Sequence, residues 1–128
     1  MSLLSTHGMM RRFLLFCVVV LATAVACAEP PATEPIPRGR QLFGQLGCSN
    51  CHTIDGQGGH VGPDLTHIGT TAATRRAGMS AEDYIRQSIL DPGAYVVPGY
   101  NDVMPRGFGQ RLSPSDLDAL VTFLLSHQ

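Results

Sequence analysis

The sequence predicts an all-α domain whose helices are joined by long loops. Three segments of the 128-residue chain carry apolar residues at helical spacing, and two of them open with a serine that can cap a helix. The segments between them are rich in glycine and proline, and no useful length alternates apolar and polar residues as a strand would. Loops of this length are uncommon in a small domain unless they enclose a group that completes the core.

The first predicted helix covers residues 37–47. It presents three apolar side chains at helical spacing, Leu42, Phe43 and Leu46. Gly47 follows directly, and glycine commonly follows the last turn of a helix because it accepts a left-handed backbone. We therefore expect the chain to leave the helix at Gly47.

Two further helices are predicted at residues 80–93 and 113–128. Each opens with a serine cap and an aspartate three residues later: Ser80 with Asp83, and Ser113 with Asp116. Pro114 fits the first helical position, where its missing N–H has no partner to lose. The intervening segments, residues 53–78 and 95–112, are predicted to be loops without structure of their own.

Residues 1–26 have the pattern of an export signal rather than of a fold element. Arg11 and Arg12 precede an apolar run from residue 13 to residue 25, and small residues follow it. The run is shorter than the roughly 20 residues that span a bilayer, so an uncleaved anchor is the less favoured alternative. We expect an exported protein in the periplasm or at the outer face of the bacterial cytoplasmic membrane.

The residues around Cys27 fit two kinds of export signal, that of a lipoprotein and that of a protein released by simple cleavage. Small residues at positions 24–26 lead into it, as they lead into the acylated cysteine of a bacterial lipoprotein, although Ala24 replaces the usual leucine. Lipidation of Cys27 would explain a lone thiol in an oxidising compartment. Simple secretory cleavage before Glu29 is the alternative.

The remainder of the chain divides into a tether and a domain. Residues 27–37 contain four prolines, a composition that favours an extended, semi-rigid spacer over a helix. The folded domain then runs from residue 38 to residue 128. A domain of this size has a marginal core and often depends on a metal or a cofactor.

Charge excludes one class of partner. Beyond Cys27 the chain has seven arginines and no lysine against ten carboxylates, which gives a formal charge of −3. It offers no basic stripe for a nucleic-acid backbone. We therefore expect no nucleic-acid partner and no long-range steering of a protein partner by a lysine-rich face.

The string Cys48-Ser-Asn-Cys51-His52 fits three chemistries: a zinc site, a redox disulfide, or covalent attachment of haem. Zinc needs four ligands, and His60 and His67 could complete the set only at a spacing unlike that of a zinc finger. A redox pair belongs between a strand and a helix, whereas a predicted helix precedes these cysteines. Both of these interpretations are therefore disfavoured.

Haem attachment would give a role to Cys48, Cys51 and His52 alike. Two thiols three positions apart can each bind a vinyl group, and the imidazole that follows can bind the iron. An export signal supports this interpretation because covalent attachment of haem takes place outside the cytoplasm. Met104, followed by Pro105 in a loop, is the leading candidate for the sixth iron ligand. His67 and Met79 remain alternatives, although Met79 has a structural role just before the cap at Ser80.

From about residue 37 onward the chain resembles the class I, or mono-haem, cytochromes c. Four motifs occur in the family's order: GRQLFGQLGCSNCH at 39–52, GPDL at 62–65, DPGAYVVPGYNDVMP at 91–105 and LDALVTFLLS at 117–126. The resemblance implies the class I cytochrome c fold, in which three or more helices and long loops wrap around one haem. It also implies that the first helix crosses the last, with Gly39 and Phe43 against Leu120 and Phe123.

The resemblance implies roles for individual residues at the site. It implies thioether bonds from Cys48 and Cys51 to one haem c, and iron ligation by His52 and Met104. It further implies that the Pro63 carbonyl accepts a hydrogen bond from the His52 ring, which would fix the orientation and basicity of the imidazole.

For function, the resemblance implies electron transfer rather than catalysis. A low-spin haem with both axial positions filled leaves no open site for a substrate. Residues 91–105 are most similar to the cytochrome c domains of membrane-bound respiratory complexes. We therefore expect a membrane-tethered carrier or a subunit of a respiratory or photosynthetic complex, with a quinol-oxidising or oxygen-reducing complex as partner. A haem enzyme or gas sensor with a displaceable sixth ligand is the alternative.

Overall fold

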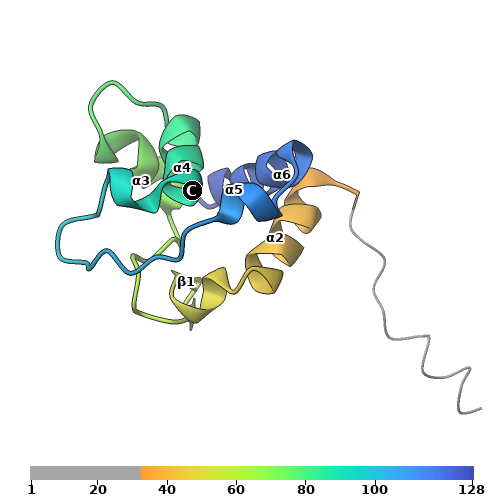
Figure 1. The fold of residues 1–128 in the computed structure, drawn as a ribbon, viewed down its shortest axis with the longest axis horizontal. Coiled ribbons are helices and arrows are strands. Elements are labelled where there is room, and N and C mark those ends of the chain that lie inside the picture. Colours follow the sequence, from red (N-terminus) through yellow and green to blue (C-terminus); the bar gives the residue numbers. More distant parts are fainter. Residues whose placement is uncertain (1–32) are drawn as a thin grey trace, which may run out of the picture. The chain divides into compact units, whose positions relative to one another are not determined.

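The computed structural model describes residues 33–128, and in them the predicted all-α architecture is confirmed (Figure 1). Their α-helices are α2 (Pro35–Gln45), α3 (Ile68–Arg75), α4 (Ala81–Leu90), α5 (Phe108–Arg111) and α6 (Pro114–Leu125). Two short 3-10 helices, η2 (Cys48–Asn50) and η3 (Pro92–Ala94), and an antiparallel hairpin of β1 (Thr53–Ile54) and β2 (Gln57–Gly58) complete this part of the chain. The predicted signal segment and Cys27 lie outside the described residues.

Helices α2 and α6 pack directly against each other, as Figure 1 shows. They approach closely at Gly39, where a Cβ atom would overlap the Ala119 carbonyl group and the Phe123 Cβ atom. The rings of Phe43 and Phe123 lie beside this point, with their centroids 5.7 Å apart. The crossing of the first and last helices that the resemblance implied is therefore present.

Helix α2 begins at Pro35, three residues before the predicted start of the domain at Arg38. Pro35 and Pro37 lie in its first turn. Proline is compatible with this position because the N–H groups of a first turn have no partner within the helix. The expectation that residues 35–37 form an extended spacer is therefore wrong.

Helices α4 and α6 begin at the two serine caps that the sequence predicted. The Ser80 hydroxyl accepts a hydrogen bond from the Asp83 N–H at 3.0 Å, and the Ser113 hydroxyl accepts one from the Asp116 N–H at 3.1 Å. The Asp116 carboxylate also pairs with Arg38 of α2 at 2.7 Å. The hydrogen bond from Arg38 lowers the pKa of Asp116, so the first turn of α6 is tied to α2 by a charged contact.

Helix α3 lies in a segment that the sequence predicted as a loop. It buries only Ile68 and Ala72, and no side chain caps its first turn. The helix is instead supported by its packing against α4. Helix α5, a single turn, and the β1–β2 hairpin likewise lie within predicted loops, so the expectation of unstructured segments is wrong at these places.

The core of the described part is centred on α6. Leu120 and Val121 are each only 2% exposed, and the buried residues Ile85 and Ile89 of α4 belong to the same cluster. Met104 packs against this core from a half-buried position. Across residues 33–128, every helix is too short or too polar to cross a bilayer.

Candidate functional site: a cavity between the Cys-x-x-Cys-His turn and Met104

The attachment segment, residues 48–52, follows α2 after a single turn. Gly47 has a left-handed φ of +76°, which ends α2 as predicted and directs the chain into η2. The N–H groups of Cys51 and His52 both donate to the Cys48 carbonyl, at 3.1 and 3.0 Å. Cys48 and Cys51 are half-buried and are not joined by a disulfide. Two sulfurs and one imidazole are thereby held in one compact turn.

Residues 58–62, here named the strap, lie against the attachment segment. The Gly59 N–H donates to the Ser49 carbonyl at 2.9 Å, and the Gly62 N–H donates to the Cys51 carbonyl at 2.8 Å. A Cβ atom on Gly59 would overlap the backbone of the attachment segment. Glycine is therefore required at position 59 because the two backbones approach closely there, a contact that could not be predicted from the sequence.

The imidazole of His52 is held in one orientation. Its Nδ1 atom lies 2.7 Å from the Pro63 carbonyl oxygen. Because a carbonyl oxygen can only accept, Nδ1 carries a proton, and in the neutral ring Nε2 then has the lone pair. Gly62 packs against the ring, where a Cβ atom would come within 2.5 Å of Cε1. Asp64 shapes the turn by accepting from the Thr66 N–H at 2.7 Å, and its hydrogen bonds to Thr66 lower the pKa of Asp64.

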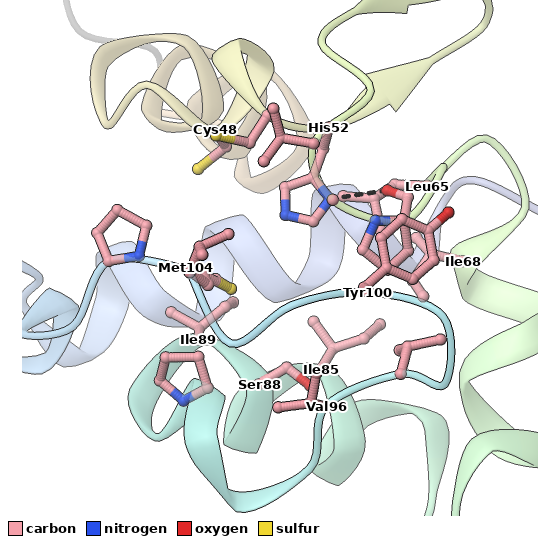
Figure 2. Close-up of a pocket in the computed structure, with 18 of the residues that line it drawn as sticks. Cys48, His52, Leu65, Ile68, Ile85, Ser88, Ile89, Val96, Tyr100 and Met104 are labelled. Atoms are coloured by element: carbon pink, nitrogen blue, oxygen red, sulfur yellow. Dashed lines mark hydrogen bonds between the residues drawn. The ribbon is translucent and has the colours of Figure 1, made fainter.

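The His52 ring reaches into a largely apolar cavity, shown in Figure 2. The space between its walls is about 1170 Å³ when the solvent in its open mouth is counted. Cys48, Cys51, Pro63 and Met104 line the same cavity. Figure 2 shows the His52 ring entering from the attachment segment and Met104 entering from the loop before α5. The structure thus brings together all the predicted site residues that it describes.

Helix α4 supplies a wall of this cavity that the sequence analysis did not assign to the site. Tyr84, Ile85, Ser88 and Ile89 all line it. Their spacing of one and four residues places them on a single helix face, which is the signal that could have identified them.

The other residues that were considered as ligands have different surroundings. His60 Nδ1 lies 3.1 Å from the Thr53 hydroxyl, and His67 Nδ1 donates to the Gln128 carbonyl at 2.7 Å. Met79 packs against the core but does not line the cavity. In residues 33–128, no three His, Cys, Asp or Glu side chains gather as a group that could hold a metal ion.

The cavity fits a haem in its chemistry. Its walls are mostly aliphatic and aromatic, as a large planar apolar group requires. Burial raises the pKa of the Cys48 thiol to about 11, so its sulfur faces the cavity in the neutral form. The free Nε2 of His52 and the thioether of Met104 are both ligands that haem iron accepts. The donor set and the apolar walls together are compatible with a haem protein.

The comparison with protein families agrees with this class. A model of the cytochrome c family, described as "Cytochrome c", matches residues 36–128. The chain therefore belongs to the cytochrome c family, whose members are haem-based electron-transfer proteins. Family membership implies haem c as the cofactor.

A curated relative matches this chain over part of a longer protein. Cytochrome c oxidase subunit 2 of Alkalihalophilus pseudofirmus is 28% identical over 102 residues. The match covers 77% of this chain but only 27% of that protein. The chain therefore spans about a quarter of the length of the relative.

Proposed function

We propose that the protein carries single electrons on one haem c, which is attached through thioether bonds to Cys48 and Cys51. His52 and Met104 would bind the iron. The observation that supports this proposal best is that the His52 ring and the Met104 side chain reach into one apolar cavity beside both cysteines.

Each side chain has a defined task in this proposal. The bound haem supplies an iron that alternates between Fe(II) and Fe(III). The Pro63 carbonyl keeps the proton on Nδ1 of His52, which leaves Nε2 as the ligand atom and increases its basicity. The neutral sulfur of Met104 favours Fe(II) and so raises the reduction potential. Apolar residues of α4, such as Ile85 and Ile89, exclude water from the cavity.

The proposal assigns no enzymatic reaction to this chain. With His52 and Met104 both on the iron, no position is free for a substrate or a gas. A haem enzyme or gas sensor would need Met104 to leave readily. Whether Met104 stays bound to the iron therefore distinguishes an electron carrier from a haem enzyme or gas sensor.

Replacing Met104 by alanine should abolish the weak far-red absorption band that a methionine–Fe(III) bond gives. The reduction potential should fall as well, because a soft ligand that favours Fe(II) is lost. The measurement is an absorbance spectrum of the oxidised protein with a redox titration. Met79→Ala is the matched control, since Met79 is the other methionine of the described part and lies off the cavity. A band that survives Met104→Ala would exclude Met104 as the ligand.

We also propose where the protein works. It would be exported to the periplasm or the outer face of the bacterial cytoplasmic membrane, as a tethered carrier or as a subunit of a respiratory or photosynthetic complex. The similarity to a cytochrome c oxidase subunit 2 supports an oxygen-reducing complex as partner, and a quinol-oxidising complex is the alternative. The absence of lysine from the chain supports a docking mode that depends little on ionic strength.

Mass spectrometry of the mature N-terminus should find a chain that starts at Cys27 and carries acyl groups. Because α2 begins at Pro35, the proposed spacer would comprise residues 28–34, and an extended chain of that length would reach about 22 Å at about 3.1 Å per residue. Cys27→Ala removes the proposed acylation site. The protein should then leave the membrane fraction, because no lipid chain remains to anchor it. An unmodified mature chain that starts at Glu29 would contradict the lipid anchor without affecting the haem assignment.

A further inference from the structure

Thr53, the residue directly after His52, has a polar side chain in a buried position. It is 3% exposed and, aromatic residues apart, it is the only polar residue that is buried among residues 33–128. It does not line the cavity, so it can act on the site only through other residues. A buried hydroxyl is costly unless its hydrogen bonds are made, so the partners of the Thr53 hydroxyl indicate what this residue does.

The Thr53 hydroxyl makes two hydrogen bonds, and both are to the strap. The hydroxyl donates to the Gly59 carbonyl at 2.8 Å and lies 3.1 Å from Nδ1 of His60. Because the single hydroxyl proton goes to Gly59, the oxygen accepts from His60, and Nδ1 of His60 carries a proton. Thr53 is therefore bonded to two consecutive residues of the strap.

The Thr53 carbonyl holds the same loop farther along the chain. It accepts a hydrogen bond from the Leu65 N–H at 2.8 Å. Thr53 is thus bonded to the chain both before and after Pro63, whose carbonyl oxygen lies 2.7 Å from Nδ1 of His52. The strap also lies close to His52, because a Cβ atom on Gly58 would overlap the His52 carbonyl oxygen. Thr53 therefore anchors the loop on both sides of the Pro63 carbonyl.

The strap depends on such contacts because its own backbone is permissive. Three of its five residues are glycine, at positions 58, 59 and 62. Glycine restricts the backbone less than any other residue, and Gly58 has a positive φ of +119°. The N–H groups of Gly59 and Gly62 hold the strap to the attachment segment through the backbone alone. The hydroxyl of Thr53 adds a side-chain contact that fixes where the strap begins.

We propose that Thr53 and His60 are positioning residues for the iron ligand His52; this inference rests on the proposed function. By fixing the strap, their hydrogen bonds keep the Pro63 carbonyl in place for the His52 ring. A strong hydrogen bond at Nδ1 increases the electron donation from Nε2 to the iron. Electron donation stabilises Fe(III), so Thr53 and His60 would lower the reduction potential and oppose the effect of Met104.

The experiment removes the Thr53 hydroxyl with little change of shape. In redox titrations of the haem-containing protein, Thr53→Val should shift the equilibrium constant for reduction toward the reduced form. Direct partners of a metal ligand commonly change its properties by roughly 10- to 100-fold, and Thr53 acts one contact farther out, so we expect about a threefold shift. Thr53→Ser keeps the hydroxyl and should restore the original potential.

Two further variants test the His60 contact and the specificity of the effect. His60→Ala should give a smaller shift in the same direction, whereas His60→Asn keeps an N–H donor and should reduce that shift. Thr122→Val is the matched control, because it makes the same chemical change at an exposed hydroxyl that donates to the Asp118 carbonyl within α6. It should leave the potential unchanged.

Exchange of the His52 Nδ1 proton with deuterated water, followed by NMR, supplies a second readout. The hydrogen bond to Pro63 protects this proton. In Thr53→Val the proton should exchange about tenfold faster, the factor that corresponds to the loss of one hydrogen bond of ordinary strength. Thr53→Ser and Thr122→Val should exchange at the original rate.

Two results would overturn the inference. One is a Thr53→Val protein with the original potential and exchange rate. The other is faster exchange at an unchanged potential, because Thr53 would then have a structural role only. If Thr53→Val does not accumulate, the comparison of His60→Ala with His60→Asn decides, since the His60 side chain is exposed. A purified chain without covalent haem would instead contradict the proposed function.

Discussion

Replacing Cys48 and Cys51 together by alanine should leave little folded protein. Without thioether bonds the cavity would lose the group that fills it. Ile85, Ile89 and Phe108 line this cavity and also form part of the core, so its collapse would affect the whole cluster. In so small a domain the binding energy of the cofactor acts as folding energy, as it does for small metal-binding domains.

The measurements are far-UV circular dichroism and protease resistance of the purified variant. The single variant Cys51→Ala is the matched control, because one thioether and the His52 ligand remain and should retain a measurable folded fraction. We expect the double variant to lose most of its helical signal and to be cleaved rapidly. A compact, protease-resistant domain without haem would contradict this account of the stability.

Replacing Gly39 by alanine should destabilise the domain by about 3 kcal/mol, the upper end of the usual cost of overpacking. The new Cβ atom would overlap the Ala119 carbonyl and the Phe123 side chain, so α2 and α6 would have to move apart. That movement would disturb the Phe43–Phe123 contact and the Arg38–Asp116 ion pair. The loss would be measured by urea unfolding of the haem-containing protein.

Gly44 provides a control in the same helix. A Cβ atom on Gly44 would meet nothing within 4 Å. Gly44→Ala should therefore stabilise the protein by about 0.5–1 kcal/mol, because alanine restricts the unfolded chain and favours the helix. If Gly39→Ala lowers the free energy of unfolding and Gly44→Ala raises it, the close contact between α2 and α6 at Gly39 is the cause. Equal effects at Gly39 and Gly44 would contradict it.

The features that could be predicted from the sequence are those that depend on neighbouring residues. The caps at Ser80 and Ser113 use a serine and an N–H three residues later, so local spacing was sufficient. The end of α2 at Gly47 follows in the same way from a single residue that tolerates a positive φ.

Helix α3 could not be predicted because its stability does not come from its own residues. It contains several threonines, which are weak helix formers, and it buries only Ile68 and Ala72. Its packing against α4 is a tertiary contact that the composition of residues 68–75 does not reveal. The position of Arg75 on the cavity could not be predicted for the same reason, since it depends on α3.

The ion pair between Arg38 and Asp116 joins residues that are 78 positions apart, and this separation has a consequence for the order of folding. Contacts between residues so far apart along the chain form more slowly than local contacts, because the intervening loop has to close first. The local turn at residues 48–52 can therefore form before α2 and α6 meet. Until they meet, Cys48 is not enclosed by the core and its sulfur is accessible. The late docking of α6 thus leaves a period in which the cysteines can react before the domain closes around them.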